Sequence, residues 1–395
     1  MIIILERNFR KKKIKLTVPI LDLKRSFKEI KPEVFSALER IFENQSFILG
    51  QDVSNFEKHC EKYLEIPEGS AVGCASGTDA LLLALMAADV KEGDEVITTP
   101  FTFFATSGTI ARLGAKPVFV DVDEKTYNIN LEQALEKITS KTKIFLPVHL
   151  FGQMCALEKV KKVFHEKNIK IIEDAAQAFG SSRIFENKIE RAGTVGDIGC
   201  YSFFPTKNLG GCGDGGMVVS NDLKTAERLK KLRVHGSTET YFHEEVGINS
   251  RLDAIQAAVL DIKLKYLEQW NEERIKIADY YKLLFKASGL REFVTPPEVL
   301  EGNRHIYHQY VIRVHAKRDD LMNYLNENGF GVRVYYPLSL HLQPCFKYLG
   351  YKKGDFPVSE KLTQEVLALP VFPGLEQSEQ EALVKKIAEF FSAKH

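Results

Sequence analysis

The chain has 395 residues, 44% of them hydrophobic, which is enough for a large buried interior and suggests two domains. Its 54 lysines and arginines nearly balance its 53 acidic residues, so the composition excludes a strong general attraction to nucleic acid or to an anionic membrane. No stretch approaches the roughly 20 consecutive apolar residues that span a bilayer.

The first 15 residues are expected to be an extension without visible function. An apolar stretch (residues 1–5) precedes a basic cluster (residues 10–13), which reverses the charge order of a signal peptide. The six cysteines are scattered and form no C-x-x-C pair, which argues against a zinc site and against a disulfide framework. The ten histidines are also dispersed. We therefore expect a cytoplasmic protein without a metal site.

Six short apolar runs between residues 70 and 220 alternate with longer amphipathic segments. This alternation is typical of an α/β fold, in which helices cover both faces of a mostly parallel sheet. Ligands of such sheets bind beyond the carboxyl ends of the strands, so the residues that follow each run are the candidates for a site. The runs are 71–75, 95–98, 117–121, 143–147, 170–173 and 216–220.

The last third of the chain is predicted to form a smaller α+β domain. Residues 253–286 have the apolar spacing of one long helix with a polar face. Two apolar runs, 309–314 and 331–335, predict strands, and 319–328 predicts a helix between them. We divide the chain into the extension (1–15), a large domain (16–262) and a small C-terminal domain (263–395).

An acidic residue, Asp174, ends the run at 170–173. The sequence Ala-Ala-Gln177 follows it, so we expect Asp174 at the carboxyl edge of the sheet and Gln177 one turn into the next helix. A carboxylate at this edge could keep the nitrogen of a bound pyridine ring protonated. The alternative is a helix cap, which Asp provides without any ligand. Taken alone, capping is the better explanation.

A phosphate site is predicted where the run at 71–75 meets Ser76-Gly-Thr78 and a strongly helical stretch. The start of a helix offers free backbone N–H groups, and the hydroxyls of Ser76 and Thr78 add further donors. These two residues could instead serve only as helix caps.

Two further segments carry side chains of interest. Phe103 lies in an aromatic cluster, where it could stack on a planar ring or belong to the core. Lys207 lies between an apolar segment and a glycine cluster, and a buried amine can form a Schiff base and act as a base. It could equally be a surface charge or a phosphate clamp. Ser202, five residues earlier, could add a hydroxyl to the phosphate site.

Four segments in this order resemble the DegT/DnrJ/EryC1/StrS family of sugar aminotransferases. They are Ser76-Gly-Thr-Asp79, Phe101-Thr-Phe103, Glu173-Asp-Ala-Ala-Gln177 and Ser202-Phe-Phe-Pro-Thr-Lys207. The resemblance continues to the C-terminus and leaves out only about the first 15 residues.

The resemblance implies an aspartate-aminotransferase-like fold (fold type I) and a homodimer whose active sites lie at the subunit interface. It also implies pyridoxal 5'-phosphate as the cofactor, with pyridoxamine 5'-phosphate as its second form. The matching positions are Lys207 for the cofactor aldehyde, Asp174 for the pyridine nitrogen, Gln177 for the ring hydroxyl, Phe103 for stacking, Gly77, Thr78 and Ser202 for the phosphate, and Asn249 for the phosphate across the dimer interface.

The implied activity is transfer of an amino group, from glutamate, to a keto group of a nucleotide-linked sugar. The segment from Tyr336 to Gly350, with His341 and Gln343 as substrate contacts, is similar to that of enzymes acting at the sugar 3-position, including those that use UDP-linked 2-acetamido-3-keto sugars. Such products serve the biosynthesis of cell-surface polysaccharide or lipid A. The alternatives are a sugar dehydratase, although histidine replaces the lysine in those relatives, and a non-catalytic regulator that binds a nucleotide sugar.

Overall fold

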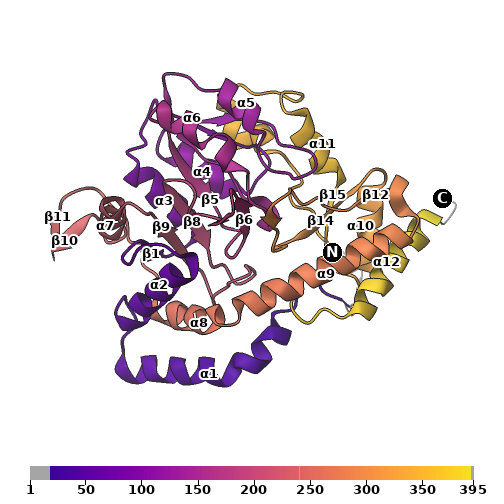
Figure 1. The fold of residues 1–395 in the computed structure, drawn as a ribbon, viewed down its shortest axis with the longest axis horizontal. Coiled ribbons are helices and arrows are strands. Elements are labelled where there is room, and N and C mark those ends of the chain that lie inside the picture. Colours follow the sequence, from indigo (N-terminus) through magenta and orange to yellow (C-terminus); the bar gives the residue numbers. More distant parts are fainter. Residues whose placement is uncertain (1–17, 240, 393–395) are drawn as a thin grey trace, which may run out of the picture.

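The computed structural model describes residues 18–239 and 241–392, so the predicted extension at 1–15 lies outside the described residues. Its centre is a seven-stranded sheet in the order β1-β9-β8-β5-β4-β2-β3 (Figure 1). The strands β8, β5, β4, β2 and β3 pair in parallel, whereas β9 is antiparallel to both neighbours. The mostly parallel sheet is therefore confirmed. The strands are β1 (Ala71–Cys74), β2 (Glu95–Thr98), β3 (Lys116–Phe119), β4 (Thr142–Phe145), β5 (Lys170–Asp174), β8 (Ile198–Ser202) and β9 (Gly216–Val219).

The sheet separates two hydrophobic cores because successive side chains of a strand point to opposite faces. On β5, for example, Ile171 belongs to one core and Ile172 to the other. Both residues are fully buried, as expected for a sheet covered on both sides. The helices of this part are α1 (Leu23–Asn44), α2 (Gln51–Leu64), α3 (Gly77–Ala87), α4 (Phe104–Arg112), α5 (Leu131–Glu136), α6 (Lys161–Glu166), α7 (Leu223–Leu232) and α8 (Ala254–Leu264), with short 3-10 turns at Leu150–Gly152 and Leu157–Lys159.

The C-terminal part has its own core around a three-stranded sheet in the order β12-β14-β15. The predicted strand at 309–314 and the predicted helix at 319–328 are confirmed as β14 and α10. Val18, at the start of the described chain, also packs in this core. The elements are α9 (Leu267–Ala287), β12 (Val294–Thr295), β14 (Tyr310–Val314), α10 (Arg318–Glu327), α11 (Pro357–Glu365), β15 (Val366–Leu369) and α12 (Gln377–Ser392), with 3-10 turns at Leu290–Glu292, Leu340–Leu342 and Pro344–Leu349.

Two predictions for this part are wrong. The single helix at 253–286 is divided into α8 and α9, which end and begin on either side of Lys265 and Tyr266. The strand at 331–335 does not form, because this segment makes only an isolated bridge between Arg333 and Ala368. The domain boundary at residue 262 stays a prediction.

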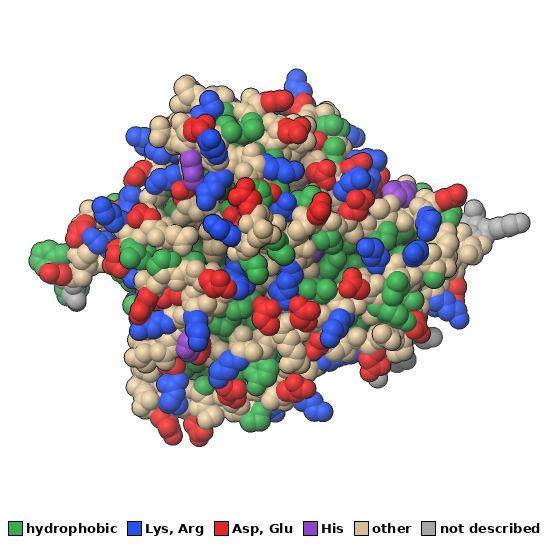
Figure 2. All heavy atoms as spheres, viewed as in Figure 1, with side chains coloured by type: hydrophobic (Ala, Val, Ile, Leu, Met, Phe, Trp, Pro, Cys, Tyr) green, Lys and Arg blue, Asp and Glu red, His purple; other side chains and the backbone are tan. Residues whose placement is uncertain are grey.

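Two small hairpins lie outside these sheets. One projects from the large part of the molecule beside α7 (Figure 1) and consists of β10 (Ser237–Glu239) and β11 (Phe242–His243). The other consists of β6 (Ser182–Phe185) and β7 (Lys188–Arg191), and β13 (Asn303–Arg304) pairs with β6. Basic and acidic side chains are interspersed over the face shown in Figure 2. Within the described residues, no helix is long and apolar enough to cross a bilayer.

Candidate active site

Asp174 lies at the carboxyl end of β5, as predicted, and is 95% buried. One carboxylate oxygen accepts a hydrogen bond from Thr106 Oγ1 at 2.8 Å, and the other accepts from the Ala176 N–H at 3.2 Å. Burial raises the pKa of Asp174, while Thr106, Ala176 and the positive charge of Lys207 lower it. An ionised Asp174 therefore depends on a cation and on donors close by.

No helix follows Asp174, so two details of its prediction are wrong. Residues 175–180 form turns, and the bond from Ala176 is a local turn contact instead of a helix cap. Gln177 accordingly is not one turn into a helix. Its Oε1 accepts from the Phe151 N–H at 2.7 Å and its Nε2 donates to the Tyr336 hydroxyl at 3.1 Å. Gln177 is thus held in place from two directions.

Lys207 lies in the loop after β8, where its N–H donates to the Phe204 carbonyl at 2.8 Å. Burial lowers the pKa of Lys207 from 10.5 to about 8, and the carboxylate of Asp174 opposes this shift. The structure therefore brings the predicted lysine and the predicted acid close enough to interact electrostatically. No side-chain hydrogen bond is found for Lys207 within the described part of the chain.

A buried polar cluster adjoins Lys207 through the next residue, Asn208. The Nδ2 of Asn208 donates to Asn271 Oδ1 at 2.7 Å, and its Oδ1 lies 3.2 Å from His308 Nδ1. Burial, with the charges of Lys207 and Arg274, lowers the pKa of His308 far below its usual value. His308 is therefore a neutral ring at neutral pH. Among the described residues, no group of three or more His, Cys, Asp or Glu is arranged to hold a metal ion.

The predicted phosphate site is the start of α3. Ser76 caps this helix, because its Oγ accepts from the Asp79 N–H at 3.0 Å. Gly77 is the first helical residue, and a Cβ built there would lie 2.5 Å from the Cβ of Ser202. The helix start thus approaches β8 more closely than any side chain at position 77 would allow. Such a cradle, with Thr78 exposed at its rim, fits the phosphate of pyridoxal phosphate.

Thr78, Phe103 and Asn249 line one cavity of about 550 Å³. Phe103 is 58% exposed, so it is not a core residue, and its ring lies 6.5 Å from that of Tyr336 in a tilted arrangement. Asn249 is held near the start of α3, because the next residue, Ser250, donates to Asp79 at 2.8 Å. Asn249 therefore lies near Thr78 of the same chain, and its contact across a dimer stays a prediction.

The two predicted substrate contacts are placed differently. His341 is buried, and both of its ring nitrogens have partners within the chain, namely Ser339 Oγ at 2.9 Å and Glu360 Oε1 at 3.1 Å. This arrangement favours a structural role for His341. Gln343 is only partly buried at the start of the 3-10 turn Pro344–Leu349, and its role stays a prediction.

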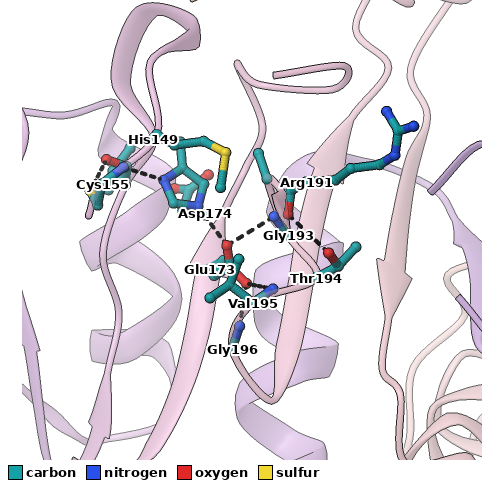
Figure 3. A network of polar contacts seen from close by, with 12 residues as sticks. His149, Cys155, Glu173, Asp174, Arg191, Gly193, Thr194, Val195 and Gly196 are labelled. Carbon is teal, nitrogen blue, oxygen red and sulfur yellow. Dashed lines mark hydrogen bonds and ion pairs between the residues drawn. The ribbon is translucent and has the colours of Figure 1, made fainter. Parts of the chain in front are cut away.

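Sequence reasoning missed three side chains that support the site: Thr106, Tyr336 and His149. His149 lies behind Asp174 and forms a hydrogen bond between Nε2 and Glu173 Oε2 at 2.6 Å (Figure 3). The Thr102 hydroxyl, just before α4, lies 3.0 Å from that of Thr106, and these two threonines were the only sequence signal for Thr106. Tyr336 and His149 are too distant from Asp174 in sequence to have been linked to it.

The geometry defines an α/β protein in which a buried acid, a lysine of lowered pKa and a helix start meet at the carboxyl edge of one sheet. The DegT/DnrJ/EryC1/StrS aminotransferase family matches residues 28–388, and the chain belongs to this family. The predictions of the family and of an aminotransferase are thereby confirmed.

Three relatives illustrate the range within the family. A "pleiotropic regulatory protein" of Geobacillus stearothermophilus is 47% identical over 95% of this chain and 99% of its own length. A UDP-N-acetyl-3-dehydro-alpha-D-glucosamine 3-aminotransferase of Acidithiobacillus ferrooxidans is 38% identical over 92% and 95%. A dTDP-3-amino-3,6-dideoxy-alpha-D-galactopyranose transaminase of Aneurinibacillus thermoaerophilus is 39% identical over 94% and 99%.

Two solved structures confirm the fold type. DesV of S. venezuelae, in complex with a ketimine intermediate, has a TM-score of 0.91 and 33% identity, covering 97% of this chain and all of that chain. NtdA of Bacillus subtilis, with bound cofactor PMP, has a TM-score of 0.85 and 29% identity, covering 97% and 87%. The aspartate-aminotransferase-like architecture expected from the sequence is therefore confirmed.

Proposed function

We propose that this protein is a pyridoxal-phosphate-dependent aminotransferase that transfers an amino group, from glutamate, to a keto group of a nucleotide-linked sugar. The observation that carries the proposal is that Asp174 and Lys207 lie near enough at the sheet edge to interact electrostatically, beside the cradle at the start of α3. Bound PMP in the NtdA structure supports the cofactor.

Each of these residues has a role in the proposed reaction. When bound, the cofactor supplies an aldehyde that accepts an amino group and a ring that stabilises the developing carbanion. Lys207, with its pKa near 8, is able both to attach the aldehyde and to carry protons at neutral pH. Asp174 would hold the proton of the ring nitrogen. Gln177 would contact the ring hydroxyl, and Phe103 would cover the ring.

The phosphate would be held by Gly77, Thr78 and Ser202. Asn249 would reach the phosphate of a second subunit, so the proposal includes a homodimer with shared sites. We place the amino group at the sugar 3-position and favour a UDP-linked 2-acetamido-3-keto sugar, since two of the relatives are named for 3-amino sugars, one of them UDP-linked. Such a step would serve cell-surface polysaccharide or lipid A biosynthesis in the cytoplasm.

The two alternatives have less support. A sugar dehydratase of this fold has histidine where this chain has Lys207. The regulator hypothesis has a counterpart in the name of the Geobacillus relative. A protein that only senses a ligand has no need of an acid, a lysine and a phosphate cradle together, all of which this chain retains.

The test is to mix purified protein with pyridoxal phosphate and then glutamate, while the visible absorbance is followed. We expect the absorbance of the bound cofactor to fall as 2-oxoglutarate appears in equal amount. A screen of keto-sugar nucleotides should then restore the absorbance with one sugar class. Unchanged absorbance with glutamate and with other amino acids would favour the regulator.

A further inference from the structure

Glu173, one residue before Asp174, is fully buried, and N–H donors surround its carboxylate. Its carboxylate accepts from the Gly193 N–H at 2.9 Å, the Val195 N–H at 2.7 Å and the Gly196 N–H (Figure 3). His149 adds a fourth contact at 2.6 Å. A buried carboxylate is costly unless donors surround it, and these four satisfy it.

The tautomer of His149 follows from its second nitrogen. The Cys155 N–H points at Nδ1 at 3.0 Å, so Nδ1 accepts and carries no proton. The proton of the ring is therefore on Nε2, which donates to Glu173. Because all four neighbours of the Glu173 carboxylate are N–H donors, only an acceptor-only side chain matches them.

The same histidine also holds the main chain of Asp174. The His149 N–H donates to the Asp174 carbonyl at 3.0 Å, and the Asp174 N–H donates to the Pro147 carbonyl at 2.9 Å. On the other side of β5, the Ala175 N–H donates to the Cys200 carbonyl at 2.9 Å. Successive side chains on a strand point to opposite faces, so Glu173 lies behind the strand while Asp174 faces the site.

We propose that Glu173 and His149 are positioning residues for the cofactor acid: they fix the peptide of Asp174, so that its carboxylate stays directed at the ring nitrogen. This inference rests on the proposed function, because it assigns the ring nitrogen as the partner of Asp174. Neither residue is assigned a contact with the cofactor. Their effect passes through Asp174, whose carboxylate accepts hydrogen bonds, within the described residues, from Thr106 and from the Ala176 N–H.

The test compares four variants with the parent protein. Glu173→Gln turns an amide N–H2 toward N–H donors, and His149→Leu removes the ring donor. His149→Gln is the conservative variant, because its amide can still donate to Glu173. Asp121→Asn is the matched control: Asp121 is 95% buried and accepts from the Val358 and Ser359 N–H groups at 2.9 and 2.8 Å, but it follows β3 and does not contact β5.

Three measurements separate positioning from simple structural support: the dissociation constant of pyridoxal phosphate, the pH at which the absorbance of the bound cofactor changes, and hydrogen exchange of residues 170–177 without cofactor. We expect Glu173→Gln and His149→Leu to weaken cofactor binding about 10- to 100-fold, the loss typical of an outer partner of a ligand. The pH midpoint should move by about one unit, and exchange at 170–177 should accelerate. His149→Gln should recover part of each effect.

Asp121→Asn should lose thermal stability while its cofactor affinity and pH midpoint stay those of the parent. Parent-like affinity and pH midpoint in folded Glu173→Gln, or equal shifts in Asp121→Asn, would overturn the inference. If Glu173→Gln does not fold, His149→Leu against His149→Gln decides in the same way. A parent protein that does not bind pyridoxal phosphate would instead refute the proposed function itself.

Discussion

At the residue scale, the lowered pKa of the partly buried Lys207 leads to a prediction about pH. Its pKa is lowered from 10.5 to about 8 in the folded chain, so the unfolded chain binds the extra proton between these two values. The destabilisation that the buried charge causes therefore has its full size below pH 8. It diminishes as the pH rises from 8 to 10.5. Cofactor-free Lys207→Met should therefore be more stable than the parent at pH 7, by about 1–3 kcal/mol, and we expect it to be inactive.

Thermal unfolding at pH 7 and pH 10.5, with both proteins free of cofactor, checks this prediction. The stability difference should shrink toward zero at the higher pH. A difference that is the same at both values would mean that the amine titrates in the native protein as it does in water.

A second prediction concerns Asp174→Asn. The amide has nearly the same shape and can keep the contact with Thr106, so the variant should fold and bind the cofactor. It cannot hold a proton on the ring nitrogen, and we expect the rate to fall about a hundredfold or more. Thr106→Val is the companion variant: it retains the charge and removes one donor, so the pKa of Asp174 should rise and the loss of rate should be smaller. Near-normal turnover by Asp174→Asn would leave Asp174 with a structural role only.

Sequence patterns predicted the positions of the two residues to which we assign the chemistry: Asp174 follows the predicted run at 170–173, and Lys207 lies between an apolar segment and a glycine cluster. They failed at Gln177, where a helix was expected. The Ala175 N–H still bonds to the Cys200 carbonyl, which keeps the chain beside β8 for one more residue. Gly180 then turns the chain with a φ of 100°, so a helix does not start. Neither the hydrogen bond to Cys200 nor the backbone conformation of Gly180 can be predicted from the local composition.

At the element scale, the approach of α3 to β8 gives a prediction for Gly77→Ala. The added methyl would lie 2.5 Å from the Ser202 Cβ, so the helix start must move away from the strand. We expect cofactor phosphate affinity to fall at least tenfold, which is about 1.4 kcal/mol. Equilibrium dialysis with pyridoxal phosphate measures this. Ser76→Ala is the comparison, since it removes the cap at a cost of about 1 kcal/mol of helix stability but leaves the close approach intact. Equal losses of affinity in the two variants would contradict the cradle.

Two strands were not predicted correctly. The strand β8 was missed, and a strand was expected at 331–335, where none forms. The strand β8, which contains Gly199, was not among the six predicted runs. The fold requires this glycine: a Cβ there would lie 2.0 Å from the Gly193 carbonyl oxygen. The apolar run at 331–335 was predicted as a strand. Its N-terminal residue bonds instead to Val18, and Arg333 bridges to Ala368, so two distant partners replace one continuous ladder.

At the scale of the whole molecule, the start of the described chain and the C-terminal part are held together. Val18 packs in the C-terminal core, and Arg25 at the start of α1 makes two hydrogen bonds of 2.7 Å to Glu379 on α12. The sequence predicted the order of two structural parts but not this connection, which joins residues more than 350 positions apart. Opposite charges separated by that distance along a chain give no local signal.

The last prediction concerns assembly. If Asn249 reaches the phosphate bound by a second subunit, cofactor binding must stabilise the dimer, because a ligand bound only by the associated state shifts that equilibrium by mass action. Asn249→Ala should weaken this linkage by roughly 1.5 to 3 kcal/mol, the value of one lost hydrogen bond to a charged group. Sedimentation and thermal unfolding with and without pyridoxal phosphate measure it, with Asn221→Ala, an exposed asparagine before α7, as the control. A parent protein that stays monomeric when saturated with cofactor would refute the shared site and leave Asn249 as a residue of its own chain's cavity.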